Sequence, residues 1–436
     1  KIEFTIIYKK NGIINSSYMR KIILFLLTIE SLVAVSQTRD SVFLYRRGSI
    51  CSFMIGHRDL SFAQEIENVF NEMPVPDKYN DHSIGKKIFY TAVGKLKMKN
   101  LDSHMGFKIN ASSDKTLMND FDFFLQKQAI ASRLIAKWFN RKKATGICNM
   151  NLVQERGYQN ASEVEKRLAA ISVRKDALLK DAGEELIGNT FVLINDIRYI
   201  DQSKGSSIIG GVVSAATQMA GALNGIEVSE ENNLGTIISS YKGFNVKIKT
   251  YLYQLIWDDE ISSYFYKDIY SENSDDKKKE NFENNRGRFS LLYLGMQESS
   301  GKSVSFLGIN KDNPQQMVRK ACQRALDENI ASLQKNFDVF KVKAPLYNIQ
   351  PLTCEIGMKE GVTENSRYEV LETVEDSKGH INYKRIGVIR PIKGKIWDNR
   401  YMAAEEKAEG ADLKFTTFEK VSGGPFFAGM LVREIK

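Results

Sequence analysis

The sequence predicts an α+β protein in which a mixed α/β main domain is followed by a small C-terminal β domain, a partly closed barrel. Two observations lead to this fold class. Apolar strands alternate with helices that carry one apolar face up to Pro345, whereas short strands and turns follow it. The 436 residues are enough for two or three domains, and their 42% hydrophobic content excludes general disorder.

The N-terminal sequence predicts export. Residues 1–18 show neither a capped helix nor a strand alternation and are interpreted as upstream translation. Residues 19–36 follow the order of a signal peptide: a cationic start, an apolar run and the small-x-small sequence Ala34-Val35-Ser36. We therefore expect cleavage before Gln37 and a location in the periplasm or outer membrane of a Gram-negative bacterium. A buried N-terminal helix is the alternative, which Glu30 would favour.

The main domain, residues 37–347, is expected to alternate strands with helices. Its expected strands are residues 49–55, 87–96, 190–200 and 244–257. Its expected helices are residues 61–73, 120–143, 162–186 and the helix that begins at Asn313-Pro314. Residues 271–288 are polar and mixed in charge, which predicts an exposed loop. Residues 298–302 are expected to form a hairpin turn between two strands.

Two segments of the main domain are candidate contact surfaces. The insertion from Gly205 to Ile226 contains no charged residue across 22 positions and includes Gly221-x-x-x-Gly225. It is interpreted as a loop and helix packed on the domain, as a helix that contacts a membrane surface or an envelope protein, or as a membrane span. The strand at 244–257 alternates an aliphatic face with a basic and aromatic one.

The C-terminal β domain, residues 348–436, is expected to contain short strands joined by turns. Residues 368–374 pair plausibly with residues 383–389, and residues 414–435 add a strand pair around Gly423-Gly424-Pro425. A domain of this size suits a partly closed barrel that folds independently of the main domain.

Motifs for catalysis are absent or imperfect. Gly295 and Gly301-Lys302-Ser303 imitate a phosphate-binding loop, but the spacing is one residue too long and a strand follows where a helix is needed. The four histidines, His57, His82, His104 and His380, are not paired at metal-ligand spacing. Glu184-Glu185 does not form a catalytic pair, because neighbouring helix residues point in different directions. No catalytic, cofactor-binding or metal-ligating residue is assigned.

The cysteines and charges add two constraints. Cys51, Cys148, Cys322 and Cys354 match no metal or redox motif, so they are expected to be four buried thiols or to include one structural disulfide, with the pairing left open. The net charge of +9 comes from Lys and Arg residues that are spread along the chain and interleaved with acids. No nucleic-acid partner is therefore expected.

Two stretches resemble known proteins. The helix from Pro314, the Gly357-x-x-x-Gly361-Val362 turn and the strand at Arg367-Tyr368-Glu369-Val370 resemble the closing part of the curli-secretion and flagellar-assembly T class of periplasmic proteins. Residues 75–82 and 182–192 resemble segments of uncharacterised exported proteins of Gram-negative anaerobes. The resemblance implies an envelope component and brings no catalytic residue.

The favoured function is that of a non-enzymatic, exported cell-envelope protein, associated with the outer membrane, which binds another envelope component in an assembly or structural role. The first alternative is an exported hydrolase with a site near Asp77, Asp81 and His82, although a solvated loop is the simpler interpretation of these residues. The second is binding of an anionic polymer through the basic end of a helix. That end comprises Lys137, Trp138, Arg141, Lys142 and Lys143.

Overall fold

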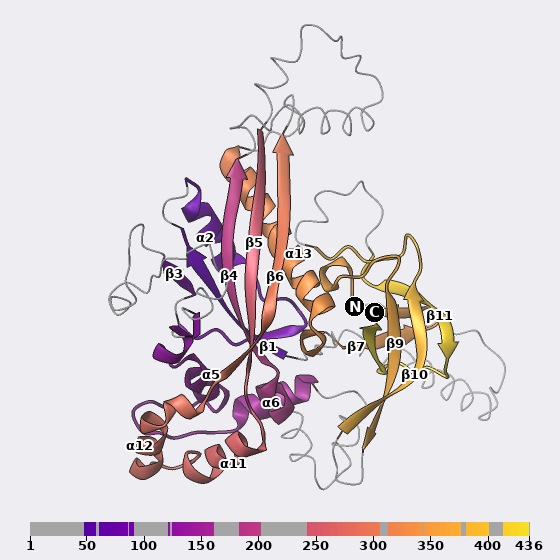
Figure 1. Ribbon diagram of the computed structural model, residues 1–436. Helices are drawn as coiled ribbons and strands as arrows, with labels where there is room; N and C mark the ends of the chain where they lie inside the picture. The colour runs from indigo at the N-terminus through magenta and orange to yellow at the C-terminus, as the bar shows by residue number, and fades with distance from the viewer. Residues whose placement is uncertain are drawn as a thin grey trace, which may run out of the picture. The chain divides into compact units, whose positions relative to one another are not determined.

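The computed structural model describes residues 48–57, 61–85, 87–90, 121–122, 124–160, 183–201, 242–305, 313–341, 343–375, 381–400 and 413–435. The expected signal peptide, the insertion at 205–226 and most of the helix expected at 162–186 lie outside these residues. The predicted α+β class is confirmed, because helices cover one sheet and a second set of strands follows it in the chain. Figure 1 shows this arrangement.

The main sheet is built around β1 (Gly48–Gly56) and β4 (Thr190–Asp201), which are parallel neighbours. β5 (Lys242–Leu255) and β6 (Leu291–Ser305) extend the sheet in antiparallel fashion beyond β4. On the other side of β1, two short parallel strands divide the edge between them. β2 (Tyr79–Asp81) pairs with residues 48–50, and β3 (Ile88–Tyr90) pairs with residues 54–56. Ser52 of β1 therefore lies between the two edge strands.

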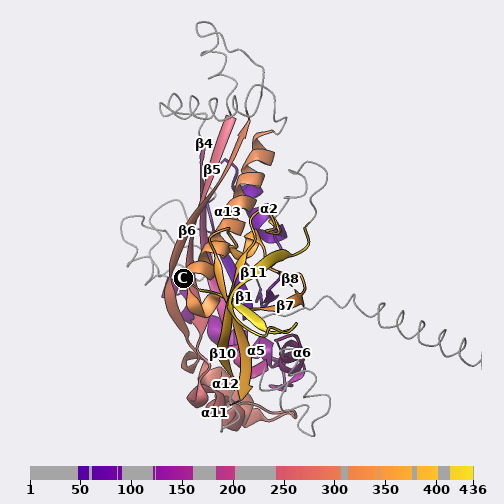
Figure 2. The same ribbon diagram turned by 90° about the vertical axis from the view of Figure 1, so that its right-hand side faces the viewer.

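Alternate residues of each strand face two separate cores. One face packs against α2 (Ala63–Glu72) and α13 (Pro314–Asn336), and Met54, Ile197 and Ile248 lie in this core. The other face packs against Phe121, Phe124 and Leu125 and against α5 (Ile130–Trp138) and α11 (Asp259–Asp268). Figure 2 shows α13 running along the strands of the sheet. Because both faces are covered over much of their length, the strands are more apolar than a half-buried sheet requires.

α13 is fixed both at its start and against the sheet. The helix begins at Asn313-Pro314, as the sequence predicts, and Asn313 and Gln316 form a reciprocal capping box that was not predicted. Opposite the helix, Gly301 of β6 has no side chain to separate the two backbones. A Cβ at this position would lie 2.2 Å from the carbonyl oxygen of Ala321. The glycine that imitates a phosphate-binding loop thus allows close packing of a helix on a strand.

Residues 298–302 do not form the expected hairpin turn. They continue β6 as one strand that pairs with β5 from Lys242 to Leu255. The polar sequence suits this position because β6 ends the described sheet path, where one strand side is left for solvent or for other groups. Lys249 of β5 and Glu298 of β6 form a cross-strand ion pair at 3.1 Å.

The helical layer also differs from the sequence prediction. The loop expected at 271–288 contains α12 (Asp276–Asn284), which Asp275 caps by accepting a hydrogen bond from the Lys278 amide, and Phe282 is its buried anchor. α6 (Asn151–Asn160) and α11 were not predicted. The helix expected at 120–143 is interrupted at Ala129, whose φ of 48° is left-handed, and α5 ends at Trp138.

The C-terminal strands close into an antiparallel ring in the order β10-β11-β8-β7-β12-β9. Their bounds are β7 (Ala344–Ile349), β8 (Leu352–Cys354), β9 (Arg367–Glu375), β10 (Ile381–Pro391), β11 (Thr416–Gly423) and β12 (Leu431–Ile435). The predicted β9–β10 pairing is confirmed. The strand pair expected within 414–435 is wrong, because β11 pairs with β10 and β8, whereas β12 pairs with β9 and β7.

The ring contacts the main sheet through the end of α13 and the chain that follows it. The Tyr79 hydroxyl donates a hydrogen bond of 2.5 Å to the Phe340 carbonyl, and the two rings stack with centroids 4.9 Å apart. Lys78 lies 3.8 Å from Glu355 of the ring. Tyr45–Lys436 accordingly forms one compact unit. Among the helices of the described residues, none has both the length and the apolar character needed to cross a bilayer.

The ring strands predict where an independently folding fragment must begin. β7 starts at Ala344, ahead of the domain boundary expected at 348, and Ala344 and Leu346 belong to the ring core. We expect a fragment of residues 341–436 to unfold cooperatively and a fragment of residues 348–436 to lack a cooperative transition, since it loses β7 between β8 and β12. Circular dichroism melts and amide dispersion measure this. A cooperative melt of the shorter fragment would show that the ring forms without β7.

Candidate functional site

His82, the centre of the expected hydrolase site, is fully buried, so the prediction of a solvated loop is wrong for this residue. Its Nε2 lies 2.9 Å from the Leu134 carbonyl oxygen, and its Nδ1 lies 2.6 Å from Arg156 Nη1. A carbonyl only accepts and a guanidinium only donates, so the imidazole is neutral with its proton on Nε2. Both ring nitrogens are therefore engaged within the fold.

The environment of His82 keeps it uncharged. Burial, followed by the positive charge of Arg156, lowers the pKa of His82 from 6.5 to about 3. The imidazole stacks on Trp138 with centroids 5.0 Å apart, and the Arg156 guanidinium covers the same indole at 4.5 Å. Arg156 also donates to Ser49 Oγ and to the Asp81 carbonyl oxygen. This cluster joins α5, α6, β1 and the end of β2.

The two acidic side chains of the expected hydrolase site form no hydrogen bond or ion pair with His82, whose ring nitrogens contact Leu134 and Arg156. Asp77 and Asp81 are exposed. Partial burial raises the pKa of Asp81, but two hydrogen bonds from Ser83 and the positive charges of Lys87 and Lys137 together outweigh this effect and leave the pKa below its ordinary value. The Asp81 carboxylate is thus held in an Asx turn with Ser83. Within the described part of the chain, no hydrogen bond or ion pair joins the side chains of Asp77, Asp81 and His82.

The basic helix end expected to bind an anionic polymer is also largely used inside the fold. Trp138 is buried and donates from Nε1 to Thr190 Oγ1 at 2.9 Å. The Arg141 side chain is 3% exposed, pairs with Glu283 and covers the Phe282 ring. Lys137 donates to the Ser83 carbonyl oxygen. Lys142 and Lys143 are exposed, so the expected five-residue patch is reduced to two.

The aromatic face of β5 is not a contact surface, because Tyr251 and Tyr253 are completely buried under the helical layer. Their burial raises the pKa of Tyr253 well above its ordinary value. Lys247 is the exposed member of this face. The expectation of a free basic and aromatic strand face is therefore wrong for its aromatic half.

Several further groups that carry chemistry are accounted for by structure. All four cysteines are buried free thiols, and burial raises the pKa of Cys51 and Cys322 to about 12. Glu184 accepts a hydrogen bond of 2.7 Å from the Tyr266 hydroxyl. At the end of β1, His57 Nε2 lies 2.6 Å from Asp196 Oδ1, which Arg198 also binds. Within the described ranges, no cluster of three or more His, Cys, Asp or Glu side chains is arranged to hold a metal ion.

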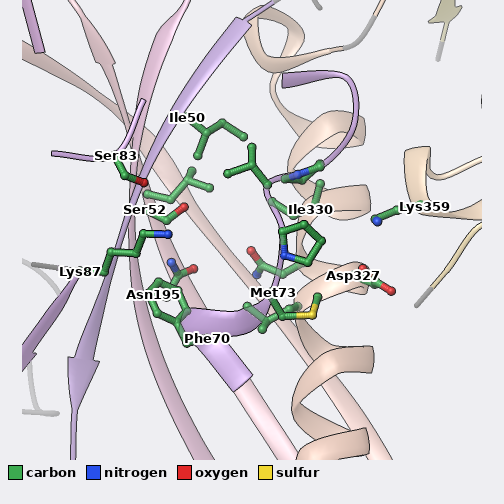
Figure 3. A pocket seen from close by; sticks show the side chains of 16 residues that line it. Ile50, Ser52, Phe70, Met73, Ser83, Lys87, Asn195, Asp327, Ile330 and Lys359 are labelled. Carbon is green, nitrogen blue, oxygen red and sulfur yellow. The ribbon is translucent and has the colours of Figure 1, made fainter. Parts of the chain in front are cut away.

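One cavity lies on the α13 side of the main sheet, beside the break between β2 and β3. It has a volume of about 70 Å³. Ile50, Phe70, Leu193 and Ile330 supply apolar wall, as Figure 3 shows in part. Polar side chains from several elements also line it. These are Ser52, Ser83, Lys87, Asn195, Asp327, Asn329 and Lys359.

The polar groups of this cavity differ in whether the fold satisfies them. Asn195 is fixed, since it donates to the Phe53 carbonyl oxygen and accepts from Thr250 Oγ1. Asn329 is 2% exposed, and its Nδ2 has no hydrogen-bond partner within the part of the chain that the structure describes. A buried donor without a partner costs about 1–3 kcal/mol. No sequence pattern marks these residues, because they come together only through the packing of α13 and the ring.

A second cavity, of about 500 Å³, lies between the C-terminal half of α13 and the ring. Its charged groups include Glu364, which pairs with Lys393, and Arg400, which forms a bidentate pair with Asp398. These groups are half-buried or exposed and already paired. The smaller cavity is therefore the better candidate for a ligand site.

His82 generates a testable prediction about stability. The folded state keeps His82 neutral to a pKa of about 3, whereas the unfolded chain binds the proton near pH 6.5. The free energy of unfolding should therefore fall by about 1.4 kcal/mol per pH unit from this group as the pH drops below 6.5. His82→Ala should lower that free energy by about 2–4 kcal/mol at pH 7 and remove this pH dependence. Urea titrations measure both, and an imidazolium signal for His82 in nitrogen NMR at pH 5 would contradict the assignment.

Comparison with known proteins does not assign this chain to a family. No protein-family model matches the chain, and no curated protein matches it. The resemblance to curli-secretion and flagellar-assembly T proteins and to exported proteins of anaerobes therefore stays a prediction from the sequence.

Proposed function

We propose that the chain is a non-enzymatic, exported component of the cell envelope that binds another envelope protein through the outer surface of its C-terminal ring. The observation that carries this proposal is the distribution of exposed apolar side chains. Of the seven large apolar side chains that are exposed in the described residues, four belong to the ring. They are Tyr347, Ile349, Val421 and Phe427.

The ring strands explain why these side chains face outward. Ala344 and Leu346 point into the ring core, so the alternating residues Tyr347 and Ile349 lie on the outer face of β7. Phe415 lies beside them, stacked on Tyr347 with centroids 4.4 Å apart. We call Tyr347, Ile349, Phe415 and Phe427 the outer apolar patch.

Phe427 belongs to the patch because its turn runs along β7. The Gly429 amide donates to the Leu346 carbonyl oxygen at 2.8 Å, and the Leu346 amide donates to the Met430 carbonyl oxygen at 2.7 Å. Phe427 is 55% exposed at the tip of this turn. Grouped aromatic and aliphatic side chains of this kind mark protein interfaces more often than single exposed residues do.

Two features of the sequence also support the proposal, namely the expected signal peptide and the uncharged insertion. Residues 19–36 have the order of a signal peptide, and the uncharged segment 205–226 is a second candidate contact with an envelope protein or membrane surface. Both lie outside the described residues.

The outer apolar patch can be tested with matched substitutions. Ile349→Ser combined with Phe427→Ser removes two patch side chains, and Leu292→Ser combined with Val339→Ser removes two side chains of similar exposure elsewhere. We expect the first pair to reduce recovery of a co-purifying envelope protein at least tenfold, as interface anchors do, and the second pair to leave it unchanged. Quantitative mass spectrometry of tagged protein from the envelope fraction measures this. Melting temperatures should stay close to the wild-type value, because all four positions are exposed.

Equal recovery with both pairs would remove the patch from the interface. A drop with the control pair alone would place the interface on the main domain.

Export is tested separately. Expressed from Met19, the chain should be trimmed before Gln37 and found outside the cytoplasm. N-terminal sequencing of material from each cell fraction decides this. An intact Met19 terminus on cytoplasmic protein would overturn the envelope location.

A further inference from the structure

The strands β9 and β10 run on beyond the rest of the ring as a two-stranded ribbon. Residues 372–375 of β9 pair with residues 381–384 of β10. β12 stops pairing with β9 at Leu371, and β11 stops pairing with β10 at Gly387. Figure 1 shows the two strands continuing together past the other strands of the ring. The ribbon therefore has outer edges that no described strand engages.

The free edge of β10 begins where the chain after β11 turns away. Gly423 and Gly424 have positive φ values of 80° and 98°, which turn the chain out of the strand. The Gly424 amide donates the last hydrogen bond, to the Ile386 carbonyl oxygen at 3.2 Å. Residues 381–385 are thus left without a neighbour on this side among the described residues. An added strand would continue the line of β11.

This edge can supply several main-chain hydrogen bonds. In an antiparallel strand, the backbone groups of alternate residues point to the same side. About two or three of the residues 381–385 therefore direct an amide and a carbonyl away from β9. An extended chain laid along the edge can form about four to six hydrogen bonds with them.

The base of the ribbon is fixed by side chains. Tyr383 packs with Leu371 and Leu431, and Lys343 Nζ lies 3.7 Å from the centroid of the Tyr383 ring. The ribbon is accordingly held in its extended form before a partner arrives. A preformed edge loses less conformational entropy on binding than a loop that must first become ordered.

The exposed side chains that border the free edge are cationic. Lys384 and Arg385 are both exposed, and neither forms an ion pair with a described residue. As neighbours in a strand they point to opposite faces of the ribbon. Glu372 lies opposite Lys384 on β9, on the side of β10 away from the free edge. A strand added to this edge would therefore meet a positive charge on each of its two faces.

We propose that the free edge of β10 binds an extended acidic segment of another protein. The segment adds to the ring as a strand antiparallel to β10 and places two adjacent acidic side chains beside Lys384 and Arg385. Main-chain hydrogen bonds supply affinity, and the two cations select the acidic sequence. This inference uses no residue of the outer apolar patch, so it holds or fails independently of that interface.

A second copy of this chain fits the edge less well. Two-fold pairing of β10 with β10 of another copy would bring the Lys384 and Arg385 side chains of both copies close together, and like charges on neighbouring strands repel. Antiparallel pairing with β9 of another copy would offset the two copies by two strand spacings, about 10 Å. A six-stranded ring with its side chains is wider than this offset.

The first test uses the full chain and the peptide Thr-Val-Asp-Glu-Val-Thr-amide, labelled with fluorescein at its N-terminus. We expect saturable binding in fluorescence anisotropy. The same peptide with Lys-Lys in place of Asp-Glu should bind at least tenfold more weakly, because its charges face Lys384 and Arg385. Equal binding of the two peptides would overturn the proposed selection of an acidic segment.

Methylation of the peptide backbone separates strand addition from simple charge attraction. Alternate amides of an extended peptide point to the same side, so methylating every second nitrogen removes the donors of one side only. Two acidic peptides, methylated in the two alternate frames, should therefore differ at least tenfold in affinity. Equal affinities of these two peptides would overturn strand addition.

Variants and hydrogen exchange then locate the site. Lys384→Glu combined with Arg385→Glu should weaken binding of the acidic peptide at least tenfold and make the Lys-Lys peptide the better ligand. Lys395→Glu combined with Lys414→Glu changes the same charge at two other exposed positions and should leave the affinity within twofold of wild type. In the wild-type chain, the acidic peptide should slow amide exchange within residues 381–385.

Two outcomes would place the partner elsewhere or change its identity. Unchanged affinity in the first double variant, or slowed exchange only at another strand, would overturn the assignment to β10. Concentration-dependent dimers of the full chain that the acidic peptide dissociates would show that a second copy occupies the edge instead. Light scattering with and without the peptide measures this.

Discussion

The packing of α13 is the constraint on which the rest of the molecule depends. Its apolar face, with Met317, Val318 and Ala321, covers the main sheet together with α2. Ser299 of β6 donates to the Ala325 carbonyl oxygen, and Arg324 donates to that of Lys302, so polar bonds fix the same contact. Further along, the helix supplies Asn329 and Ile330 to the small cavity, and Leu333 joins Phe340 in the cluster beside the ring. A shift of this helix would therefore disturb sheet, cavity and ring junction together.

The elements predicted from the sequence are those whose own residues carry the apolar pattern of a buried strand or helix. β1 and β4 are continuous apolar runs that are buried on both faces, the first half of β5 alternates, and α13 repeats its buried residues every third to fourth position. All four were expected near their observed bounds. α12 was missed because only Phe282 is buried on it, so its pattern is that of a polar loop. The Ser-Ser-Gly-Lys sequence of β6 indicated a turn, but its pairing with β5 overrides that local preference.

The functional residues were less accessible to sequence reasoning, because their roles depend on partners far along the chain. The local sequence predicts a loop position for His82. Its buried state depends on Arg156, which lies 74 positions further along the chain. Asn329 and Lys359 belong to patterns that predict a helix and a turn correctly and say nothing about a shared cavity. The Gly-x-x-x-Gly turn illustrates this: Gly361 adopts a φ of 82° that suits glycine, while Lys359 between the glycines is carried to the cavity wall.

The closure of the C-terminal strands into a ring has a consequence for recognition. Each of the six strands has a neighbour on both sides over part of its length. Among the described residues, however, residues 372–375 of β9 and residues 381–385 of β10 pair only with each other, so the end of this strand pair keeps an open edge of backbone donors and acceptors. Recognition by strand addition, in which main-chain hydrogen bonds supply affinity with little regard for sequence, is closed where the strands are paired on both sides and is open at the end of the β9–β10 pair. A partner of the fully paired parts of the ring must instead be selected by the shape and chemistry of side chains and turns, which makes its recognition sensitive to single substitutions on both sides.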